Sequence, residues 1–159
     1  MEQTFIFDLD GLLADCQHRV HLVTADKPNW DAFYNACSRD LPIRSSFAVY
    51  HALRKYGYRI VVSTGRVENV RDKSVEWMLH NNLAYPHELL MRPDADYCKD
   101  VELKARHVAW LRSNGCTIVG AFDDRQRVIE LYHSLGIPAY HLDSTALSQA
   151  VDAAEDKGE

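Results

Sequence analysis

Two aspartates near the beginning of the sequence, Asp8 and Asp10, have a spacing that could do chemistry. They follow the apolar run 5–7, and side chains two residues apart on a strand point to the same side. Because two like charges repel there, we expect a cation between them, and Mg²⁺, which prefers oxygen ligands, fits best. The alternative is an ordinary strand that ends in an acidic turn, since Asp and Gly are common turn residues.

Polar side chains also accompany apolar runs further along the chain. Thr64 ends one such run, and Asp123 and Asp124 follow another. Lys104 lies on the apolar stripe of an expected helix, where it either faces inward or extends outward to solvent. Together with the first pair of aspartates, these residues form a set suited to handling phosphate.

Each member of this set has a plausible task in phosphate transfer. Asp8 can attack phosphorus to give an acyl phosphate. Asp10 can protonate the leaving oxygen and then accept a proton from water, which requires a carboxyl that burial and nearby charges keep protonated part of the time. Mg²⁺ held by Asp8, the backbone carbonyl of Asp10 and Asp123 would reduce the repulsion between nucleophile and phosphate. Thr64 and Lys104 would bind phosphoryl oxygens.

The elements that must position these residues alternate along the chain. Apolar runs predict strands over 5–7, 59–64, 89–91, 117–122 and 139–142. Helical spacing and caps predict helices over 45–56, 68–82, 100–113, 126–135 and 147–154, with Gly65 and Arg66 turning into the second of these. The alternation predicts an α/β fold, a three-layer Rossmann-like parallel sheet with helices on both faces. Ligands gather at the carboxyl ends of such strands, where the polar residues lie.

Residues 14–43 have no clean period and mix aromatic with polar side chains. We expect a small helical cap insert after the first strand, and the alternative is an irregular first helix packed on the core. His18, Arg19 and Trp30 of this segment would line the mouth of the site, where a ring can stack on a base and a cation can bind a second phosphate. With this insert, residues 1–159 are expected to form a single domain.

Composition limits the classes of function. The 159 residues carry a formal net charge of −5, and no basic run is longer than two residues, so any contact with nucleic acid should be small and local. No apolar run approaches the length of a membrane span, and the first residues are too acidic for a signal peptide, so we expect a cytoplasmic protein. Four cysteines without paired spacing are expected to be reduced: Cys16, Cys37, Cys98 and Cys116.

Four motifs in this order resemble those of the haloacid dehalogenase (HAD) superfamily of phosphohydrolases. They are Asp8-Leu9-Asp10-Gly11, Ser63-Thr64-Gly65-Arg66, Lys104 and Asp123-Asp124-Arg125. The Thr-Gly-Arg, the Lys99-Asp100 ahead of Lys104 and the Phe-Asp-Asp-Arg are similar to the phosphatase domain of phage-type polynucleotide kinase/3′-phosphatase. The resemblance covers about residues 4–143.

The resemblance implies a role for each matched residue. Asp8 would be the nucleophile, Asp10 the acid and base, and Thr64 and Lys104 the phosphate binders. The metal ligands would be Asp8, Asp10 and Asp123, with Asp124 acting beside them or through water. Arg66 and Arg125 match arginines of the family and would support the site or contact substrate; the alternative is surface ion pairs with Glu68 or Glu130.

Two features depart from the family's pattern. Leu12 stands where many members have threonine, which removes a hydroxyl beside the nucleophile. The sequence also has no Gly-x-x-x-x-Gly-Lys-Ser/Thr motif, so kinase activity, like any ligase activity, would come from a separate protein.

Three functions follow from these observations. The first is a Mg²⁺-dependent phosphatase acting on the 3′-phosphate ends of DNA or RNA, because a small cap leaves the mouth open to a polymer. The second is a nucleoside monophosphate phosphatase, which the acidic balance favours. The third is a catalytically inert relative that serves as a binding module, against which the retention of all the charged positions argues.

Overall fold

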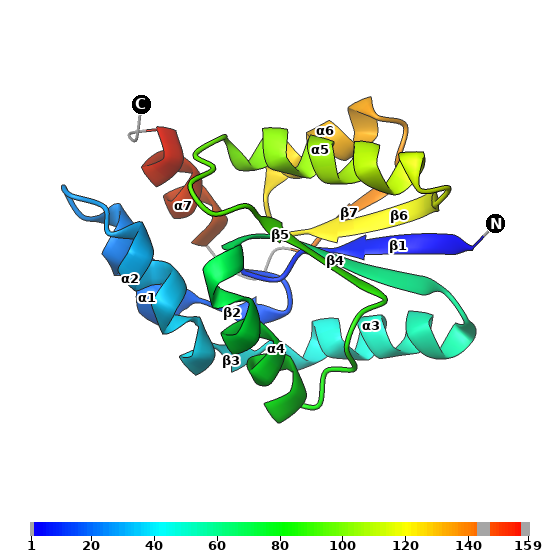
Figure 1. Ribbon diagram of the computed structural model, residues 1–159, viewed down its shortest axis with the longest axis horizontal. Coiled ribbons are helices and arrows are strands. Elements are labelled where there is room, and N and C mark those ends of the chain that lie inside the picture. Colours follow the sequence, from blue (N-terminus) through cyan, green and yellow to red (C-terminus); the bar gives the residue numbers. More distant parts are fainter. Residues whose placement is uncertain (1, 143–146, 157–159) are drawn as a thin grey trace.

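A five-stranded parallel sheet forms the centre of the molecule in the computed structural model, which describes residues 2–142 and 147–156 (Figure 1). The spatial order of its strands is β5-β4-β1-β6-β7. Their bounds are Gln3–Phe7 (β1), Arg59–Val67 (β4), Glu88–Arg92 (β5), Thr117–Asp123 (β6) and Ala139–His141 (β7). The strands that precede the carboxylate motifs, β1 and β6, are therefore neighbours, with Phe7 opposite Phe122.

Helices cover both faces of the sheet, as the alternation predicts (Figure 1). One face packs against α3 (Arg44–Tyr56) and α4 (Arg71–His80), and the other against α5 (Asp100–Ser113) and α6 (Gln126–Ser134). The short 3₁₀ helix η2 (Glu68–Val70) leads into α4. The two apolar layers hold β1 rigidly, because its side chains alternate between them: Phe7 lies in the first and Ile6 in the second.

The insert after β1 is a small helical cap. It contains a two-stranded antiparallel pair, β2 (Ala14–Asp15) with β3 (Leu41–Pro42), and between these strands α1 (Gln17–Thr24), α2 (Trp30–Asn35) and the 3₁₀ helix η1 (Ala36–Arg39). Its aromatic residues Trp30, Phe33 and Tyr34 contact one another edge-on or tilted. The prediction of a helical insert is confirmed, and its helices lie beside the carboxyl ends of the strands (Figure 1).

One local prediction is wrong. Gly65 and Arg66 do not form a turn after Thr64, because β4 continues through an irregularity and pairs again with β5, Val67 opposite Arg92. The helical segment begins at Glu68, as predicted. A side chain at position 65 would not fit, since a Cβ there would lie 2.8 Å from Oδ1 of Asp100. The extended backbone aims the Arg66 side chain into the interior, where it is fully buried.

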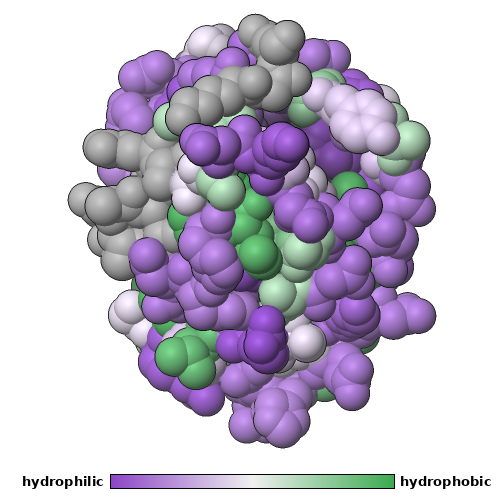
Figure 2. Space-filling model, turned by 90° about the vertical axis from the view of Figure 1, so that its left-hand side faces the viewer, coloured by the Kyte–Doolittle hydropathy of each residue, from purple (hydrophilic) through white to green (hydrophobic). Residues whose placement is uncertain are grey.

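The last described helix, α7 (Leu147–Asp156), packs against the cap rather than the sheet, since Val151 and Ala154 join the apolar cluster of Val20, Val23 and Phe33. None of the helices in the described ranges has the length and apolar character needed to cross a membrane. The surface seen in Figure 2, the end of the molecule with the cap and α7, has a strip of apolar side chains among mostly hydrophilic ones.

Candidate active site

Four buried charged residues meet at the carboxyl ends of β1 and β6. We call Asp8, Lys104, Asp123 and Asp124 the strand-end cluster. Lys104 Nζ lies 2.5 Å from Asp8 Oδ1 and 3.6 Å from Asp123 Oδ2, and it also donates to the carbonyl of Ser63. The prediction that Lys104 faces inward is confirmed, since its side chain is completely buried on the inner face of α5. Residues up to 116 positions apart, from 8 to 124, thus converge at the ends of these two neighbouring strands.

The carboxylates of this cluster are arranged as ligands for a cation. Oxygens of Asp8, Asp123 and Asp124 all lie within 4.8 Å of one another. Asp123 Oδ2 and Asp124 Oδ1 are buried without a hydrogen-bond partner, which is costly unless something else binds them. Gly11 gives Asp124 its room, because a Cβ at position 11 would overlap the Asp124 carboxylate. An all-oxygen set of this kind fits a hard divalent ion.

The protonation of this cluster reflects its excess of negative charge. Burial, opposed by the charge of Lys104 and reinforced by that of Asp123, raises the pKa of Asp8 to about 8. Burial and the charges of Asp123 and Asp8 raise the pKa of Asp124 to about 9. Burial would lower the pKa of Lys104, but the two facing carboxylates hold it well above its usual range. Three carboxylates facing one ammonium need a further cation to be ionised together.

A second group of charges lies beside the first, between the cap and β4. We call Asp10, Arg19, Asp40 and Arg66 the cap-side cluster. Both arginines donate to Asp10 Oδ1, Arg19 at 2.7 Å and Arg66 at 2.6 Å, and both bind Asp40 Oδ2 at 2.7 Å. Arg19 comes from α1, Arg66 from β4 and Asp40 from the residue after η1, so the ion pairs join the cap to the sheet.

Asp10 is held as a carboxylate by this arrangement. Burial alone would raise the pKa of Asp10, but the charges of Arg19 and Arg66 and their hydrogen bonds outweigh it and hold the pKa well below its usual range. The expectation that burial and nearby charges keep Asp10 partly protonated is therefore wrong for the free protein. Its geometry suits accepting a proton, and any proton that it donates must arrive with the substrate.

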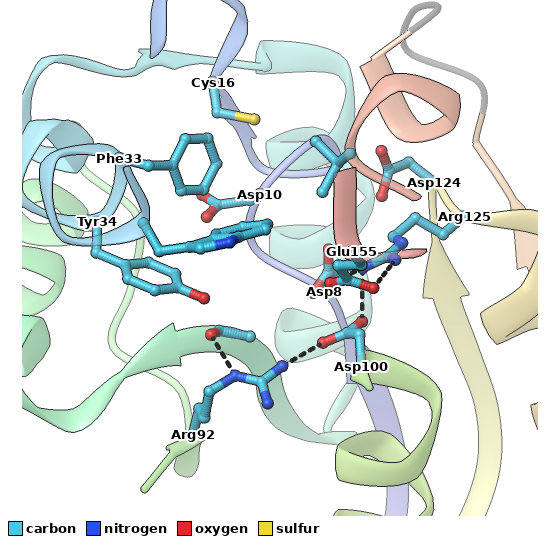
Figure 3. Close-up of a pocket in the computed structure, with 13 residues that line it drawn as sticks. Asp8, Asp10, Cys16, Phe33, Tyr34, Arg92, Asp100, Asp124, Arg125 and Glu155 are labelled. Atoms are coloured by element: carbon cyan, nitrogen blue, oxygen red, sulfur yellow. Dashed lines mark hydrogen bonds and ion pairs between the residues drawn. The ribbon is translucent and has the colours of Figure 1, made fainter. Parts of the chain in front are cut away.

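The two clusters face a cavity of about 60 Å³. Asp8, Asp10, Asp124 and Arg125 line it on the sheet side, and aromatic residues of the cap line it on the other (Figure 3). Since one water needs about 10–15 Å³ by this measure, the cavity has room for a few heavy atoms, which is the size of a phosphoryl group.

A chain of ion pairs closes the lower side of this cavity (Figure 3). The carboxylate of Asp100, at the start of α5, forms ion pairs with Arg125 at 3.1 Å and with Arg92 at 3.6 Å. Arg125 also donates to two carboxylates of α7, Asp152 at 2.6 Å and Glu155 at 2.6 Å. Burial would raise the pKa of Asp100, but the charges of Arg125, Lys104 and Arg92 lower it, so this residue is a fixed anion.

Comparison with known proteins places the chain in a family. Residues 2–146 match the family model described as the polynucleotide kinase PNKP phosphatase domain. The chain belongs to this PNKP phosphatase family. It is therefore a phosphatase of the HAD type, and the resemblance seen in its motifs is confirmed. No curated protein sequence matches it.

Solved structures share the fold of this PNKP-family phosphatase. A chain of the Pnkp1/Rnl/Hen1 RNA repair complex is 24% identical with a TM-score of 0.72, over 89% of this chain and 42% of that one, so the phosphatase spans less than half of this relative. A predicted phosphatase from Clostridium acetobutylicum is 15% identical with a TM-score of 0.65, over 99% and 98% of the two chains. A HAD family enzyme from Bacteroides thetaiotaomicron, in complex with magnesium and inorganic phosphate, is 12% identical with a TM-score of 0.52, over 89% and 94%.

The PNKP-family phosphatase brings together most of the residues that the sequence singled out, with two changes. Asp124 belongs directly to the carboxylate triad, whereas the Asp10 carboxylate is outside it and bound by arginines. Thr64 is fully buried next to Ser63, and its Oγ1 accepts the backbone N–H of Arg66 at 3.2 Å.

The arginines predicted to contact substrate lie deeper than expected. Arg19 and Arg66 have no exposed side-chain surface and bind Asp10 and Asp40, so this geometry favours support of the site over substrate contact. His18 keeps 34% of its side chain exposed and contacts Asp40 at 2.8 Å.

The alternative of surface ion pairs is wrong for both Arg66 and Arg125. Glu68 binds Arg71 at 2.7 Å, and Glu130 accepts from Gln126 at 3.1 Å. Arg125 is instead nearly buried at the edge of the cavity.

Sequence reasoning assigned no role to five charged groups in and around the site: Asp40, Arg92, Asp100 and the two α7 carboxylates, Asp152 and Glu155. Asp100 gave one signal, because it was noted ahead of Lys104, but an acidic residue in the first turn of a helix is also ordinary. Asp40 gave no signal, since it lies in a segment without periodicity.

Proposed function

We propose that this phosphatase removes the 3′-phosphate from the ends of DNA or RNA, using Mg²⁺ and an aspartyl-phosphate intermediate. One observation carries the chemistry: three buried carboxylates and one ammonium meet at a cavity of phosphoryl size, and two of the carboxylate oxygens have no hydrogen-bond partner. The family model and the relative in an RNA repair complex support a nucleic-acid end as the substrate.

Asp8 acts as the nucleophile in this proposal. Because Lys104 holds Oδ1, we assign Oδ2 to the attack on phosphorus, which breaks the bond to the 3′-oxygen. Lys104 and the backbone around Thr64 stabilise the phosphoryl oxygens that gain charge. Bound Mg²⁺, held by Asp8, Asp123, Asp124 and the backbone carbonyl of Asp10, would reduce the repulsion between nucleophile and phosphate, and the magnesium and phosphate bound by the Bacteroides enzyme support this assignment.

Asp10 moves the protons. In the first step it passes a proton to the leaving 3′-oxygen, and in the second it takes a proton from the water that hydrolyses the acyl phosphate and frees Asp8. Because Arg19 and Arg66 keep the free carboxyl ionised, the first proton must enter with the substrate. The monoanion of a phosphomonoester carries such a proton, and its second pKa is about 6.

A nucleoside monophosphate is the second candidate substrate, and a specific observation favours it. The groove beside the cavity carries four carboxylates, Asp31, Asp94, Asp96 and Glu155. A strand with many phosphates is repelled by such a surface, whereas a single nucleoside is not. For a strand end, kinase or ligase activity would be supplied by a separate protein.

A phosphate-release screen tests the proposal. The substrates are an oligonucleotide with a 3′-phosphate, the same oligonucleotide with a 5′-phosphate, nucleoside monophosphates and a sugar phosphate, each with Mg²⁺ or with EDTA. We expect Mg²⁺-dependent release that is fastest from the 3′-phosphorylated oligonucleotide. Faster release from free nucleotides would favour the second candidate, and equal release with EDTA would refute the metal dependence.

A further inference from the structure

The helix α7 forms part of the wall of the catalytic cavity although it lies beyond the residues matched to the family, which end at 146. Val151 and Glu155 line the cavity. Arg125 anchors the helix through Asp152 and Glu155, while Ala154 packs in the apolar cluster of the cap. A carboxylate of α7 is therefore fixed next to the place where the phosphoryl group binds.

A larger groove of about 440 Å³ continues from the cavity. The two hollows share Trp30, Tyr34, Arg92 and Glu155, so these residues stand where one passes into the other. Because the cavity holds little more than a phosphoryl group, the leaving group of a larger substrate must lie in the groove. Trp30 and Tyr34 offer aromatic surface for a base there.

The charges around this junction are mostly negative. Of the two cations that line the groove, Arg92 lies 3.6 Å from Asp100 and Lys99 lies 3.9 Å from Asp156, so both are partly neutralised. Asp96, further along, has its pKa lowered to about 2 by the backbone N–H of Cys98 and by Arg106, so it is an anion. Glu155 is the acidic member of the groove that also lines the cavity. It pairs with Arg125, but three carboxylates share that one guanidinium group, so an excess of negative charge remains beside the cavity.

We propose that Glu155 is a specificity-determining residue that disfavours substrates with a second phosphate close to the scissile one. The inference rests on the proposed phosphatase reaction and adds to it a discrimination between leaving groups. A 3′-phosphorylated strand carries such a second phosphate on the 5′ side of its last nucleoside, whereas a nucleoside 3′-monophosphate does not. Glu155 thus lowers the rate on a strand end below what the strand's other contacts would give, without reversing the preference for strand ends that the proposed function expects.

Two small substrates isolate this effect. Thymidine 3′-monophosphate and thymidine 3′,5′-bisphosphate differ only in the second phosphate, and kcat/KM for release of the 3′-phosphate is measured for each at low ionic strength. For the unaltered protein we expect a preference of about tenfold for the monophosphate, the size of one like-charge contact near a protein surface. The preference should shrink as salt is added.

A matched pair of variants locates the effect. Glu155→Gln keeps an oxygen that can accept from Arg125 but removes the charge, and should reduce the preference to about twofold. The control, Glu130→Gln, makes the same change at an exposed residue of α6 that lines neither hollow, and should leave the preference unchanged. The melting temperature of Glu155→Gln, compared with that of the unaltered protein, verifies that the variant remains folded.

The possible outcomes distinguish a failure of this inference from a failure of the proposed phosphatase function. If the unaltered protein releases no phosphate from either nucleotide or from a 3′-phosphorylated oligonucleotide, the proposed function fails and the inference with it. If it hydrolyses both nucleotides equally well, or if Glu155→Gln changes the preference no more than Glu130→Gln, only the assignment to Glu155 is overturned.

Discussion

The strand-end cluster and the cap-side cluster are both buried, and both consist of acidic and basic side chains, yet their charges balance differently. The cap-side cluster pairs two carboxylates with two guanidinium groups, and its ion pairs are 2.6–2.7 Å long. The strand-end cluster sets three carboxylates against one ammonium. The charges of the cap-side cluster therefore balance, whereas those of the strand-end cluster balance only when a cation is bound.

This difference indicates which charged residues fix the geometry of the site and which take part in the reaction. A buried ion pair with all its hydrogen bonds made fixes geometry, and removing one partner leaves an unpaired buried charge. Carboxylates that repel one another, and whose oxygens lack hydrogen bonds, bind a metal ion readily because the ion removes the repulsion. Such groups are therefore the ones expected to take part in the reaction. Asp10 joins the two clusters, since it lines the cavity while the arginines fix its position.

The largest effect should come from the nucleophile of the strand-end cluster. Asp8→Asn keeps the size of the side chain but removes the attacking oxygen anion, so phosphate release should fall at least about 10³-fold. The measurement is phosphate release with saturating Mg²⁺, with Asp26→Asn, an exposed loop residue, as control. An Asp8→Asn variant with the activity of the control would show that the nucleophile lies elsewhere.

Stability should respond in opposite directions in the two clusters. Asp40→Asn leaves Arg19 and Arg66 facing Asp10 alone, and should lower the free energy of unfolding by about 3–5 kcal/mol. Asp124→Asn removes one of three repelling carboxylates, and in EDTA should leave the free energy of unfolding unchanged or raise it by about 1 kcal/mol. Urea denaturation followed by tryptophan fluorescence measures both, and a similar loss in the two variants would contradict the distinction.

The pH dependence of stability should also divide the clusters. The pKa values of Asp8 and Asp124, about 8 and about 9, are raised above the ordinary carboxyl value of 3.8. At a pH between the ordinary value and the raised values, the folded state therefore binds more protons than the unfolded state. Stability in EDTA should therefore fall as the pH rises from 6 to 9. The lowered pKa of Asp10 contributes stability that is already complete above pH 4 and constant over this window.

Mg²⁺ should cancel that fall, because it takes the place of the protons. We expect the increase in melting temperature on adding Mg²⁺ to grow from pH 6 to pH 9, reaching at least about 5 °C. At each pH the melting temperature is measured in a calcium-free buffer that contains either Mg²⁺ or EDTA. A Mg²⁺ effect that is largest at pH 6, or that persists in Asp124→Asn, would argue against binding at the triad.

The sequence predicts the strand-end cluster better than the cap-side cluster for a physical reason. Asp8, Asp123 and Lys104 lie on or directly after regular elements, and the topology of a parallel sheet brings the ends of β1 and β6 together whatever the details of packing. Lys104 was visible because it interrupts an apolar stripe, and its complete burial confirms that reading of α5.

The cap-side cluster depends on features that no periodicity encodes. Asp40 is 21 residues from Arg19 and 26 from Arg66 along the chain, in a segment of short elements. The direction of Arg66 depends on β4 continuing past Gly65, where the sequence favours a turn between strand and helix. Glu155 of α7 is part of the cavity wall because α7 packs against the cap and binds Arg125, and the periodicity of the sequence predicts neither contact.

The smallest effect should come from the exposed edge of the cap-side cluster. His18→Gln removes one of the contacts to Asp40, which keeps its bonds from both arginines, so the free energy of unfolding should fall by less than about 1 kcal/mol. KM should also change little if His18 supports Asp40, whereas a rise of about tenfold in KM with kcat unchanged would mean that His18 binds substrate, as the sequence suggested. The same kinetic experiment thus decides whether the cap-side cluster ends at Asp40 or reaches the substrate.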